Sequence, residues 1–396
     1  MPPAVALPEQ FRRFADGAER DGAVTYAAIC RGVADRADVL DLVLQAPESQ
    51  QRPNIILAAV HYLLLRGAAH ALALHYDTVR QVRGVDLDGE QLATSVDRED
   101  VVALFTDFCR TFRSDLGDLC STRRTQTNEV GRCSALLPAL SFVSAGIPHR
   151  SIAFLDLGTS AGLNLFFDRY AYTYREQASG ATRRGGDVAS SVNLECVVRQ
   201  PLGALPSLDV PEVLARAGLD MDPVDATSDE GAQWLLACLW PDNLARFVRL
   251  REALHIARAS FITTTTAPVP PIHHGDIVED LARVAATMAD DAPLVVFHSW
   301  VAAYLTPERQ EELVAAVQDL ARGRPLHYLY AEAPNETPRL PTPPSPSTSP
   351  NASARTALVH IDFTTPASRR PDAVRLADMH PHGRWLHWWA SPPVAT

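Results

Sequence analysis

The stretch FLDLGTSAGLNLFFDRYAY, from Phe154 to Tyr172, has the residue types and spacing of a ligand-binding turn. A hydrophobic run from Ile152 to Leu157 contains one acid, Asp156, and ends in a loop with glycines at positions 158 and 162. An apolar-periodic segment follows the loop. This order predicts a strand, a tight turn and a helix N-terminus, which together commonly hold a nucleotide or another anionic or polar ligand.

The spacing of the glycines disfavours the best-known nucleotide fingerprints. A dinucleotide fingerprint needs G-x-G-x-x-G, but Ser160 stands where the middle glycine would be. A phosphate loop needs Gly-Lys-Ser/Thr after the glycines, and the sequence lacks it there. NAD, FAD and ATP are therefore disfavoured, and the alternative interpretation is an ordinary strand-to-helix turn.

The pattern D-x-G-x-x-x-G, from Asp156 to Gly162, resembles the first motif of class I methyltransferases that depend on S-adenosylmethionine (SAM). In that fold the glycine turn lets the backbone approach the amino-acid portion and the ribose of the cofactor. An acid after the second strand binds the ribose hydroxyls, and an Asp after the third strand reaches the adenine. The resemblance implies that Asp220 or Asp222 holds the ribose and that Asp276 holds the adenine.

The interval between Gly162 and Asp220 is longer than one helix and one strand require, so an insertion is expected there. It is expected to include SVNLECVVRQPLGALP, in which Glu195 is a rival for the ribose, ranked after Asp220 and Asp222. The expected cofactor-binding residues are Asp156, Gly158, Thr159, Ser160, Gly162, Asn164, Asp220, Asp222, Asp276 and Ser299.

Two side chains are candidates for the chemical step. The run PLVVFHSWVAAYL places His298 where the fourth strand of that fold should end and face the substrate. His298 is the first choice for a general base, because neutral imidazole is available at pH 7, and Glu129 is the second. The expected substrate-binding residues are Gln126, Asn128, Arg132 and Tyr304.

The polar segment RRTQTNEVGR directly precedes the apolar run CSALLPALSFV, for which a helix is predicted. Its polar groups would lie at the N-terminal end of that helix. One interpretation is a clamp over the cofactor or the substrate. The other is a capped helix start, in which Thr127 or Asn128 is the cap and Glu129 interacts with the helix dipole. Both interpretations stay open.

The two halves of the chain differ in periodicity. Residues 1–150 have apolar residues at helical spacings and no strand alternation, which predicts an N-terminal all-helical domain or cap. In residues 151–396 short apolar runs alternate with helical segments, which predicts a Rossmann-like, mostly parallel α/β sheet. TALVHIDF and RWLHWWAS are expected to close it as an antiparallel pair. Residues 335–356, rich in Pro, Ser and Thr, predict a flexible surface insertion.

Composition limits the class of protein. The net charge of −11 argues against nucleic acid as a partner, and six cysteines without a CxxC pair are typical of free thiols in a reducing compartment. The N-terminus lacks the features of a signal peptide, so a cytoplasmic location is expected. His61 and Arg66 in the most apolar stretch favour a buried helix over a membrane span. We expect His61 to be a hydrogen-bonded core histidine and expect no metal site; the oligomeric state is left open.

Several longer phrases are similar to a bacterial family, domain of unknown function 2332. The phrases run from residue 53 to beyond residue 300 and are RPNIILAAVHYLLL, TQTNEVGRCSALLPAL, LGTSAGLNLFFDRYAY, GLDMDPVD, WLLACLWPD and VVFHSWVAAYL. What the resemblance implies is a methyltransferase-like fold without an agreed substrate.

The favoured function is therefore methyl transfer from SAM to a small-molecule substrate, by in-line attack of a nucleophile on the sulfonium methyl group. A second hypothesis is a SAM-using cyclase or lyase on the same fold. A third is a non-catalytic SAM-binding sensor or assembly protein.

Overall fold

The computed structural model describes residues 6–85, 98–262, 270–347, 356–364 and 371–391. The chain divides into two compact units, residues 1–127 with 228–251 and residues 128–227 with 252–396. This division differs in two places from a single boundary at residue 150. Residues 128–150 belong to the second unit, and residues 228–251 belong to the first.

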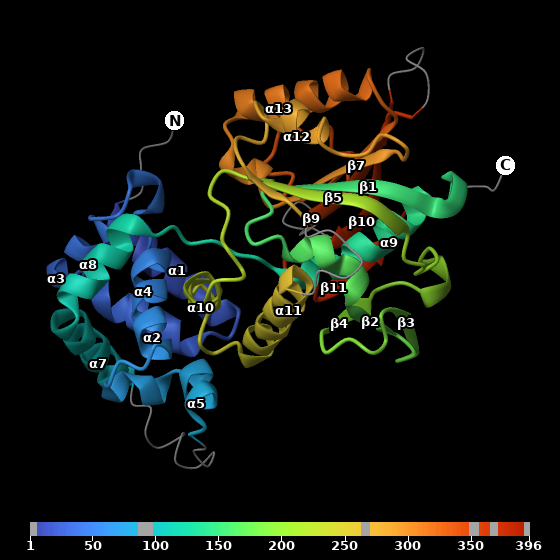
Figure 1. The fold of residues 1–396 in the computed structure, drawn as a ribbon. Helices are drawn as coiled ribbons and strands as arrows, with labels where there is room; N and C mark the ends of the chain where they lie inside the picture. Colours follow the sequence, from blue (N-terminus) through green and yellow to red (C-terminus); the bar gives the residue numbers. More distant parts are fainter. Residues whose placement is uncertain (1–5, 86–97, 263–269, 348–355, 365–370, 392–396) are drawn as a thin grey trace. The chain divides into compact units, whose positions relative to one another are not determined.

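Among its described residues the first unit contains helices and no strand, as the sequence predicts (Figure 1). Its helices are α1 (Leu7–Arg20), α2 (Val24–Val33), α3 (Ala37–Val43), α4 (Pro53–Leu65), α5 (Asp77–Arg83), α7 (Arg98–Thr111), α8 (Arg113–Thr122) and α10 (Asp229–Ala237). Pro53 begins α4, because the first turn of a helix does not need the missing N–H. Residues 228–251 belong to this unit because α10 packs on α4, with the rings of Tyr62 and Trp234 5.6 Å apart.

His61 is a satisfied core histidine, as predicted. It lies fully buried on α4, with Nδ1 3.1 Å from the carbonyl oxygens of both Ala237 and Leu239. Its Nε2 lies 2.8 Å from Thr78 Oγ1. Burial lowers the pKa of His61 to about 4, although the hydrogen bonds with the backbone of Ala237 and Leu239 oppose this shift. The imidazole therefore ties α4 to residues 237–239 in its neutral form.

We expect the free energy of unfolding of the first unit to fall as the pH drops from about 6.5 to about 4. In this window the unfolded chain binds a proton at His61 that the folded chain does not, and the loss is about 3 kcal/mol by pH 4. Urea denaturation at pH 7, 5.5 and 4 measures it, with His61→Gln as the control. The variant should lose this part of the pH dependence. If the free energy of unfolding changes with pH equally in the wild type and in His61→Gln, the assignment is contradicted.

The second unit contains one mixed sheet. Eleven strands of its described residues pair in the order β3-β2-β4-β11-β10-β9-β8-β7-β1-β5-β6. The strands are β1 (Ser151–Leu157), β2 (Ala171–Glu176), β3 (Thr182–Gly186), β4 (Asn193–Val198), β5 (Glu212–Asp220), β6 (Ile272–His274), β7 (Leu294–Ser299), β8 (Leu326–Glu332), β9 (Thr356–Asp362), β10 (Ala373–Met379) and β11 (Trp385–Trp388). The run β8-β7-β1-β5-β6 is entirely parallel. The prediction of a mostly parallel α/β sheet is confirmed.

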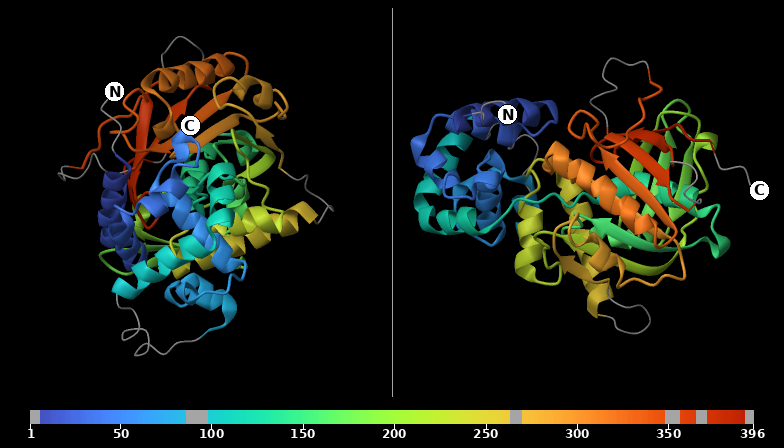
Figure 2. Two further views of the ribbon diagram at one scale, coloured as in Figure 1. Left: turned by 90° about the vertical axis from the view of Figure 1, so that its left-hand side faces the viewer. Right: turned by 90° about the horizontal axis from the view of Figure 1, so that it is seen from above.

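Helices cover both faces of this sheet (Figure 2). They are α9 (Cys133–Ser144), the C-terminal part of α11 (Leu244–Ile262), α12 (Leu281–Ala285) and α13 (Pro307–Ala321). Leu313 and Val317 of α13 share a core with Leu155 and Val296 of the parallel strands. On the opposite face the Tyr174 hydroxyl donates to the Ser134 carbonyl of α9 at 2.8 Å. The strands β1, β7 and β8 are buried along nearly their whole length and mostly apolar, because both of their faces are covered.

The C-terminal end of the sheet is antiparallel, as predicted, but it contains one strand more than expected. TALVHIDF forms β9 and RWLHWWAS contains β11, yet the two do not pair with each other. The unpredicted strand β10 lies between them and is antiparallel to both. Its apolar pattern is interrupted by a buried ion pair, in which Arg375 Nε donates to Asp378 Oδ1 at 2.7 Å.

Residues 335–347, the described part of the expected insertion, make hydrogen bonds to neighbouring strands. The Tyr330 hydroxyl donates to the Pro341 carbonyl at 2.9 Å, and Arg375 Nη1 donates to the Pro343 carbonyl at 2.8 Å. The Ser345 hydroxyl donates to Asp378 Oδ2 at 2.5 Å. Composition suggests flexibility because the segment has few apolar side chains, but its backbone carbonyls bind partners on β8 and β10. The rest of the expected insertion, up to residue 355, lies outside the described residues.

The glycine loop leads into a 3-10 helix, η5 (Leu163–Arg169), rather than the regular helix that the sequence predicts. The backbone departs from helical angles at Phe166, and the chain enters β2 at Ala171. β2, β3 and β4 fill the long interval before Asp220. The loop consequently offers a ligand its own backbone and no long helix N-terminus.

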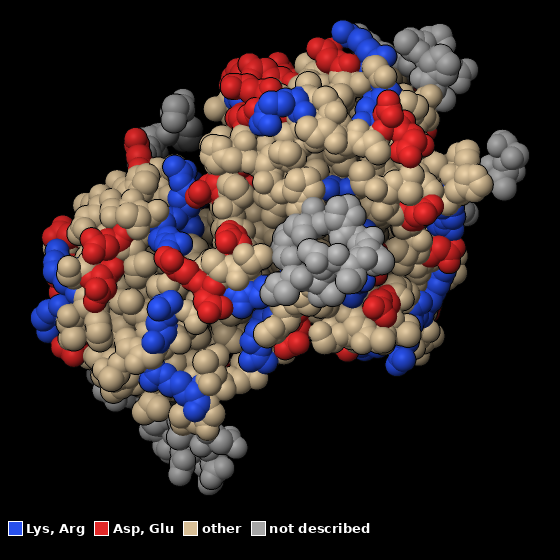
Figure 3. Space-filling view, in the orientation of Figure 1, with Lys and Arg blue, Asp and Glu red and all other residues tan. Residues whose placement is uncertain are grey.

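All six cysteines are free, and all but Cys238 are buried. No helix among the described residues has the length and apolar character needed to cross a membrane. In Figure 3 acidic side chains gather over α13, whose sequence PERQEELVAAVQDLA has four acids and one arginine. This helix presents little positive charge to a nucleic-acid backbone.

Candidate functional site

The carboxyl ends of the parallel strands meet at one edge of the sheet. After β1 the chain forms β2, β3 and β4 at the far end of the sheet, then adds β5 on one side of β1 and later β7 on the other side. The order of connection therefore reverses between β1 and β7. In open α/β sheets ligands bind outside the carboxyl ends of the strands at such a switch point. A ligand site in the second unit is therefore expected among the loops after β1, β5 and β7.

The loop after β1 has a conformation that its glycines make possible. Gly158 has φ 66° and Gly162 has φ 73°, both in the left-handed region. A Cβ atom on Gly158 would lie 2.3 Å from Cγ2 of Val301, in the loop after β7. Ser160 also has a positive φ of 55°. The loop after β1 thus packs against the loop after β7 through backbone that only glycine allows.

Asp220 joins the loop after β1 to the end of β5. Its Oδ2 accepts the Ser160 N–H at 2.7 Å, and its Oδ1 accepts the Asp222 N–H at 2.8 Å. A carboxylate has about four acceptor positions, so these two hydrogen bonds leave it capacity for a ligand hydroxyl. Asp222 itself is exposed. Glu195 lies on β4, which β11, β10, β9, β8 and β7 separate from β1. The topology thus removes Glu195 as a rival of Asp220.

Asp156 lies beneath the glycine loop and is 1% exposed. Its Oδ2 accepts the Thr159 hydroxyl at 2.8 Å. Burial, with a smaller contribution from the charge of Asp220, raises the pKa of Asp156 to about 7, and hydrogen bonds from Thr159 and Asn164 oppose this. Asp156, Thr159 and Asn164 therefore form a buried support for the loop.

Asp156→Asn should stabilise the protein at pH 8 and not at pH 4. Between about pH 4 and pH 7 the folded state keeps a proton on Asp156 that the unfolded state has released, so the free energy of unfolding falls as the pH rises. The asparagine variant lacks this loss and should be more stable by up to about 4 kcal/mol at pH 8. Urea denaturation at both pH values measures the difference. A variant less stable than the wild type at pH 8 would contradict the assignment.

Asp276 lies two residues beyond the end of β6. Its Oδ1 accepts the Val278 N–H and Arg309 Nη2, each at 2.7 Å. Burial alone would raise its pKa, but the hydrogen bonds from the backbone and from Arg309 outweigh burial and hold the pKa below its usual value. Asp276 is thus an ionised carboxylate at the same edge of the sheet as Asp220, one strand further out.

The polar segment before α9 joins the loops on the two sides of the switch point. Asn128 Nδ2 donates to the Thr159 carbonyl of the β1 loop at 3.1 Å. Arg132 Nη1 donates to the carbonyl of Ser299, at the end of β7, at 3.1 Å.

The other two expected substrate-binding residues lie elsewhere. Gln126 belongs to the first unit. Tyr304, in η7 (Ala302–Tyr304) after β7, is 78% exposed.

Glu129 is the cap of the short helix η3 (Val130–Arg132), which precedes α9. Its Oε1 accepts the Gly131 N–H at 2.9 Å, and its Oε2 lies 3.3 Å from Nδ1 of His382. The expected caps Thr127 and Asn128 do not fill this role, because Asn128 binds the glycine loop instead. The segment thus contains a capped helix start and also a bridge between two loops.

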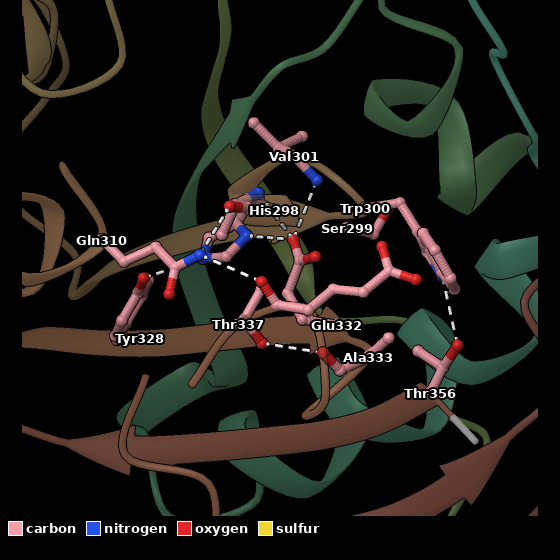
Figure 4. A network of polar contacts seen from close by, with 12 residues as sticks. His298, Ser299, Trp300, Val301, Gln310, Tyr328, Glu332, Ala333, Thr337 and Thr356 are labelled. Carbon is pink, nitrogen blue, oxygen red and sulfur yellow. Dashed lines mark hydrogen bonds and ion pairs between the residues drawn. The ribbon is translucent and has the colours of Figure 1, made fainter. Parts of the chain in front are cut away.

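His298 lies in a closed hydrogen-bonded network at the end of β7 (Figure 4). It is fully buried, with Nδ1 2.7 Å from Glu332 Oε1 and Nε2 2.7 Å from the Tyr328 hydroxyl. A general base needs a nitrogen within reach of the substrate proton, and both nitrogens of His298 are already engaged. This geometry does not fit the role of general base that the sequence suggested.

Glu332 and Tyr328 were not among the residues selected from the sequence. The signal available was the phrase LHYLYAE, an apolar strand that ends in an acid. Asp156 near the end of β1 and Asp220 at the end of β5 follow the same pattern. Among the described residues no group of three or more His, Cys, Asp or Glu side chains is arranged to hold a metal ion.

The chain belongs to the family described as uncharacterized protein conserved in bacteria (DUF2332), whose model matches residues 8–388. The resemblance inferred from the quoted phrases is thus confirmed at the level of the family. A comparison with curated proteins gives no match. The family description assigns no reaction.

Proposed function

We propose that the second unit binds SAM at the edge of the sheet where β1, β5, β6 and β7 end, and transfers its methyl group to a small molecule. The observation that carries the proposal is the hydrogen bond from the Ser160 N–H to Asp220. It couples a glycine-rich turn at the switch point to an acid at the end of the neighbouring strand. This pairing suits a ligand with a polar chain at one end and a ribose at the other.

Each part of the cofactor has a candidate partner at this edge. The backbone of Gly158–Gly162 would approach the amino-acid portion. Asp220 would accept the ribose hydroxyls with its open acceptor positions, and Asp276 would receive the adenine amino group. Asp156, Thr159 and Asn164 would support the loop from below. The exposed Tyr304 and the bridging Asn128 and Arg132 remain the candidates for substrate contacts.

The chemical step would depend on position rather than on a strong base. Attack on a sulfonium methyl group requires the nucleophile to be held in line and water to be excluded. Both nitrogens of His298 are engaged, and the buried Glu129 carboxylate already contacts the Gly131 N–H and His382 Nδ1. A neutral amine or an already ionised acceptor is therefore the class of nucleophile that fits best.

The engagement of His298 and Glu129 with other protein groups also supports a second candidate function, a SAM-binding sensor without turnover. A cyclase or lyase using the same cofactor is a further variant, and its products would differ. S-adenosylhomocysteine indicates methyl transfer, and methylthioadenosine indicates attack elsewhere on the cofactor. Mass spectrometry of the nucleoside products after incubation with SAM and a bacterial metabolite extract separates the three.

Calorimetric titration tests the proposal, with SAM and S-adenosylhomocysteine as ligands and NADH and ATP as comparisons. We expect micromolar binding of the two sulfur compounds and a loss of at least about tenfold in Asp220→Asn. The control is Asp168→Asn, which removes a carboxylate that pairs with Arg216 at 2.7 Å in the same unit. Asp168→Asn should bind normally. If the protein binds neither SAM nor S-adenosylhomocysteine, the proposal is refuted.

A further inference from the structure

The loop after β7 is held in a strained conformation. Trp300 has φ 56°, in the left-handed region, where a bulky side chain is rarely found. Such a conformation is energetically unfavourable and persists only where its surroundings fix it. Ser160, in the loop after β1, has φ 55°. The loops on the two sides of the switch point thus each contain one strained residue that is not glycine.

Four hydrogen bonds hold the strained loop to the neighbouring strands. The Trp300 N–H donates to the Ala331 carbonyl of β8, and its indole N–H donates to Thr356 Oγ1 of β9, each at 3.1 Å. The next two amides, of Val301 and Ala302, both donate to Glu332 Oε1, at 2.9 and 3.1 Å. A single carboxylate oxygen therefore fixes the two residues that follow the strained position.

Glu332 is held in turn by the hydrogen-bonded network drawn in Figure 4. It is 1% exposed, and the oxygen that binds the loop also binds His298 Nδ1 at 2.7 Å. A carboxylate oxygen only accepts, so a neutral His298 donates from Nδ1 to Glu332 and accepts from the Tyr328 hydroxyl at Nε2. The His298 ring stacks on Tyr330 at 5.5 Å. The imidazole thus supplies one oriented hydrogen bond and has no exposed nitrogen.

This loop packs closely against the glycine loop. The side chain of Val301 fills the space where Gly158 would have a Cβ atom. Displacement of Val301 would therefore open or shift the turn that lies at the switch point. The connection runs from Tyr328 and His298 through Glu332 to Val301 and then to Gly158.

We infer that Glu332, oriented by His298, is a positioning residue for the ligand site at the switch point. It keeps Trp300–Ala302 in the strained arrangement and, through Val301, keeps the glycine loop in the shape that the ligand needs. The inference rests on the proposed function, because S-adenosylhomocysteine, the product of methyl transfer from SAM, is the ligand used to test it. It assigns His298 an orienting role, in place of proton transfer to a substrate.

The test compares two isosteric changes that each remove a buried carboxylate charge from the second unit. Glu332→Gln changes the residue that holds the loop, and the control Asp378→Asn changes a residue of β10 whose carboxylate is bound by Arg375 and Ser345. Titration with S-adenosylhomocysteine measures affinity, and urea denaturation measures stability. We expect Glu332→Gln to bind about tenfold to a hundredfold more weakly and Asp378→Asn to bind as the wild type does.

Tyr328→Phe is a milder second variant, which removes only the hydroxyl that orients His298. It should fold and weaken binding by a smaller factor than Glu332→Gln. Hydrogen exchange of the Val301 and Ala302 amides should accelerate in both site variants and not in Asp378→Asn. If the wild type binds S-adenosylhomocysteine and Glu332→Gln binds it with the same affinity, this inference is overturned and the proposed function stands. The same holds if Glu332→Gln and Asp378→Asn lose equal amounts of affinity. A wild type that binds no S-adenosylhomocysteine would overturn both.

Discussion

Gly158→Val should lower the affinity for SAM by at least about a hundredfold. A side chain at position 158 is disfavoured by the positive φ, and its Cβ would meet Val301 at 2.3 Å. Either Val301 moves, which displaces the loop after β7, or the glycine turn moves, which displaces the backbone proposed to hold the cofactor. The strain and the overpacking together should also reduce the free energy of unfolding by about 2–5 kcal/mol. Titration calorimetry and urea denaturation measure the two effects.

The matched control is Gly180→Val in the turn between β2 and β3. Gly180 has φ 72°, close to that of Gly158, but no atom lies within 4 Å of its ideal Cβ position. This variant isolates the cost of the left-handed backbone, about 1–2 kcal/mol. It should retain full affinity for SAM. Equal losses of affinity in the two variants would show that general destabilisation, and not the shape of the site, explains the result.

Asp378→Ala should reduce the free energy of unfolding of the second unit by about 3–5 kcal/mol. Asp378 is 0% exposed and Arg375 is 5% exposed, so the change leaves a buried guanidinium without its carboxylate. The Ser345 hydroxyl also loses its acceptor. Residues 335–347 should then become accessible, and limited proteolysis should cut this segment first. Urea denaturation measures the loss of stability.

Replacing both members of the ion pair distinguishes a lost interaction from an unpaired charge. The double variant Arg375→Met, Asp378→Leu removes both charges, and well-packed apolar pairs of this kind are often neutral or stabilising. It should recover much of the stability lost in Asp378→Ala. The Pro343 carbonyl would still lose its donor, so proteolysis near residue 343 should remain faster than in the wild type. A double variant as unstable as Asp378→Ala would mean that the ion pair itself stabilises β10.

The sequence predicted those elements whose physical cause is local. β1, β7 and β8 could be recognised as apolar runs because both of their faces are buried. The start of α4 could be recognised from Pro53. β10 was missed because Arg375 and Asp378 interrupt its pattern, and two charges on a strand suggest exposure unless their mutual pairing is known.

The sequence predicted the loops of the candidate site but not the residues that hold these loops in place. Gly158 and Asp220 could be found because a glycine turn and an acid at a strand end are visible in the sequence. Glu332 was not found, because its role depends on contact with Val301 and Ala302, about thirty residues away in the chain. His298 was found for its chemistry, but its burial and its two partners depend on the packing of β7 beside β8. Sequence reveals which groups can react, and only the fold reveals which nitrogen atoms are already occupied.

Hydrogen exchange in the presence and absence of S-adenosylhomocysteine tests the central claim most directly. If SAM compounds bind at the switch point, saturating ligand should slow the exchange of backbone amides in residues 158–162 and 220–222. Peptides from β4 and from the helices of the first unit serve as internal references and should be unchanged. Binding without protection of the loops after β1 and β5, or protection confined to other segments, would contradict the location of the site.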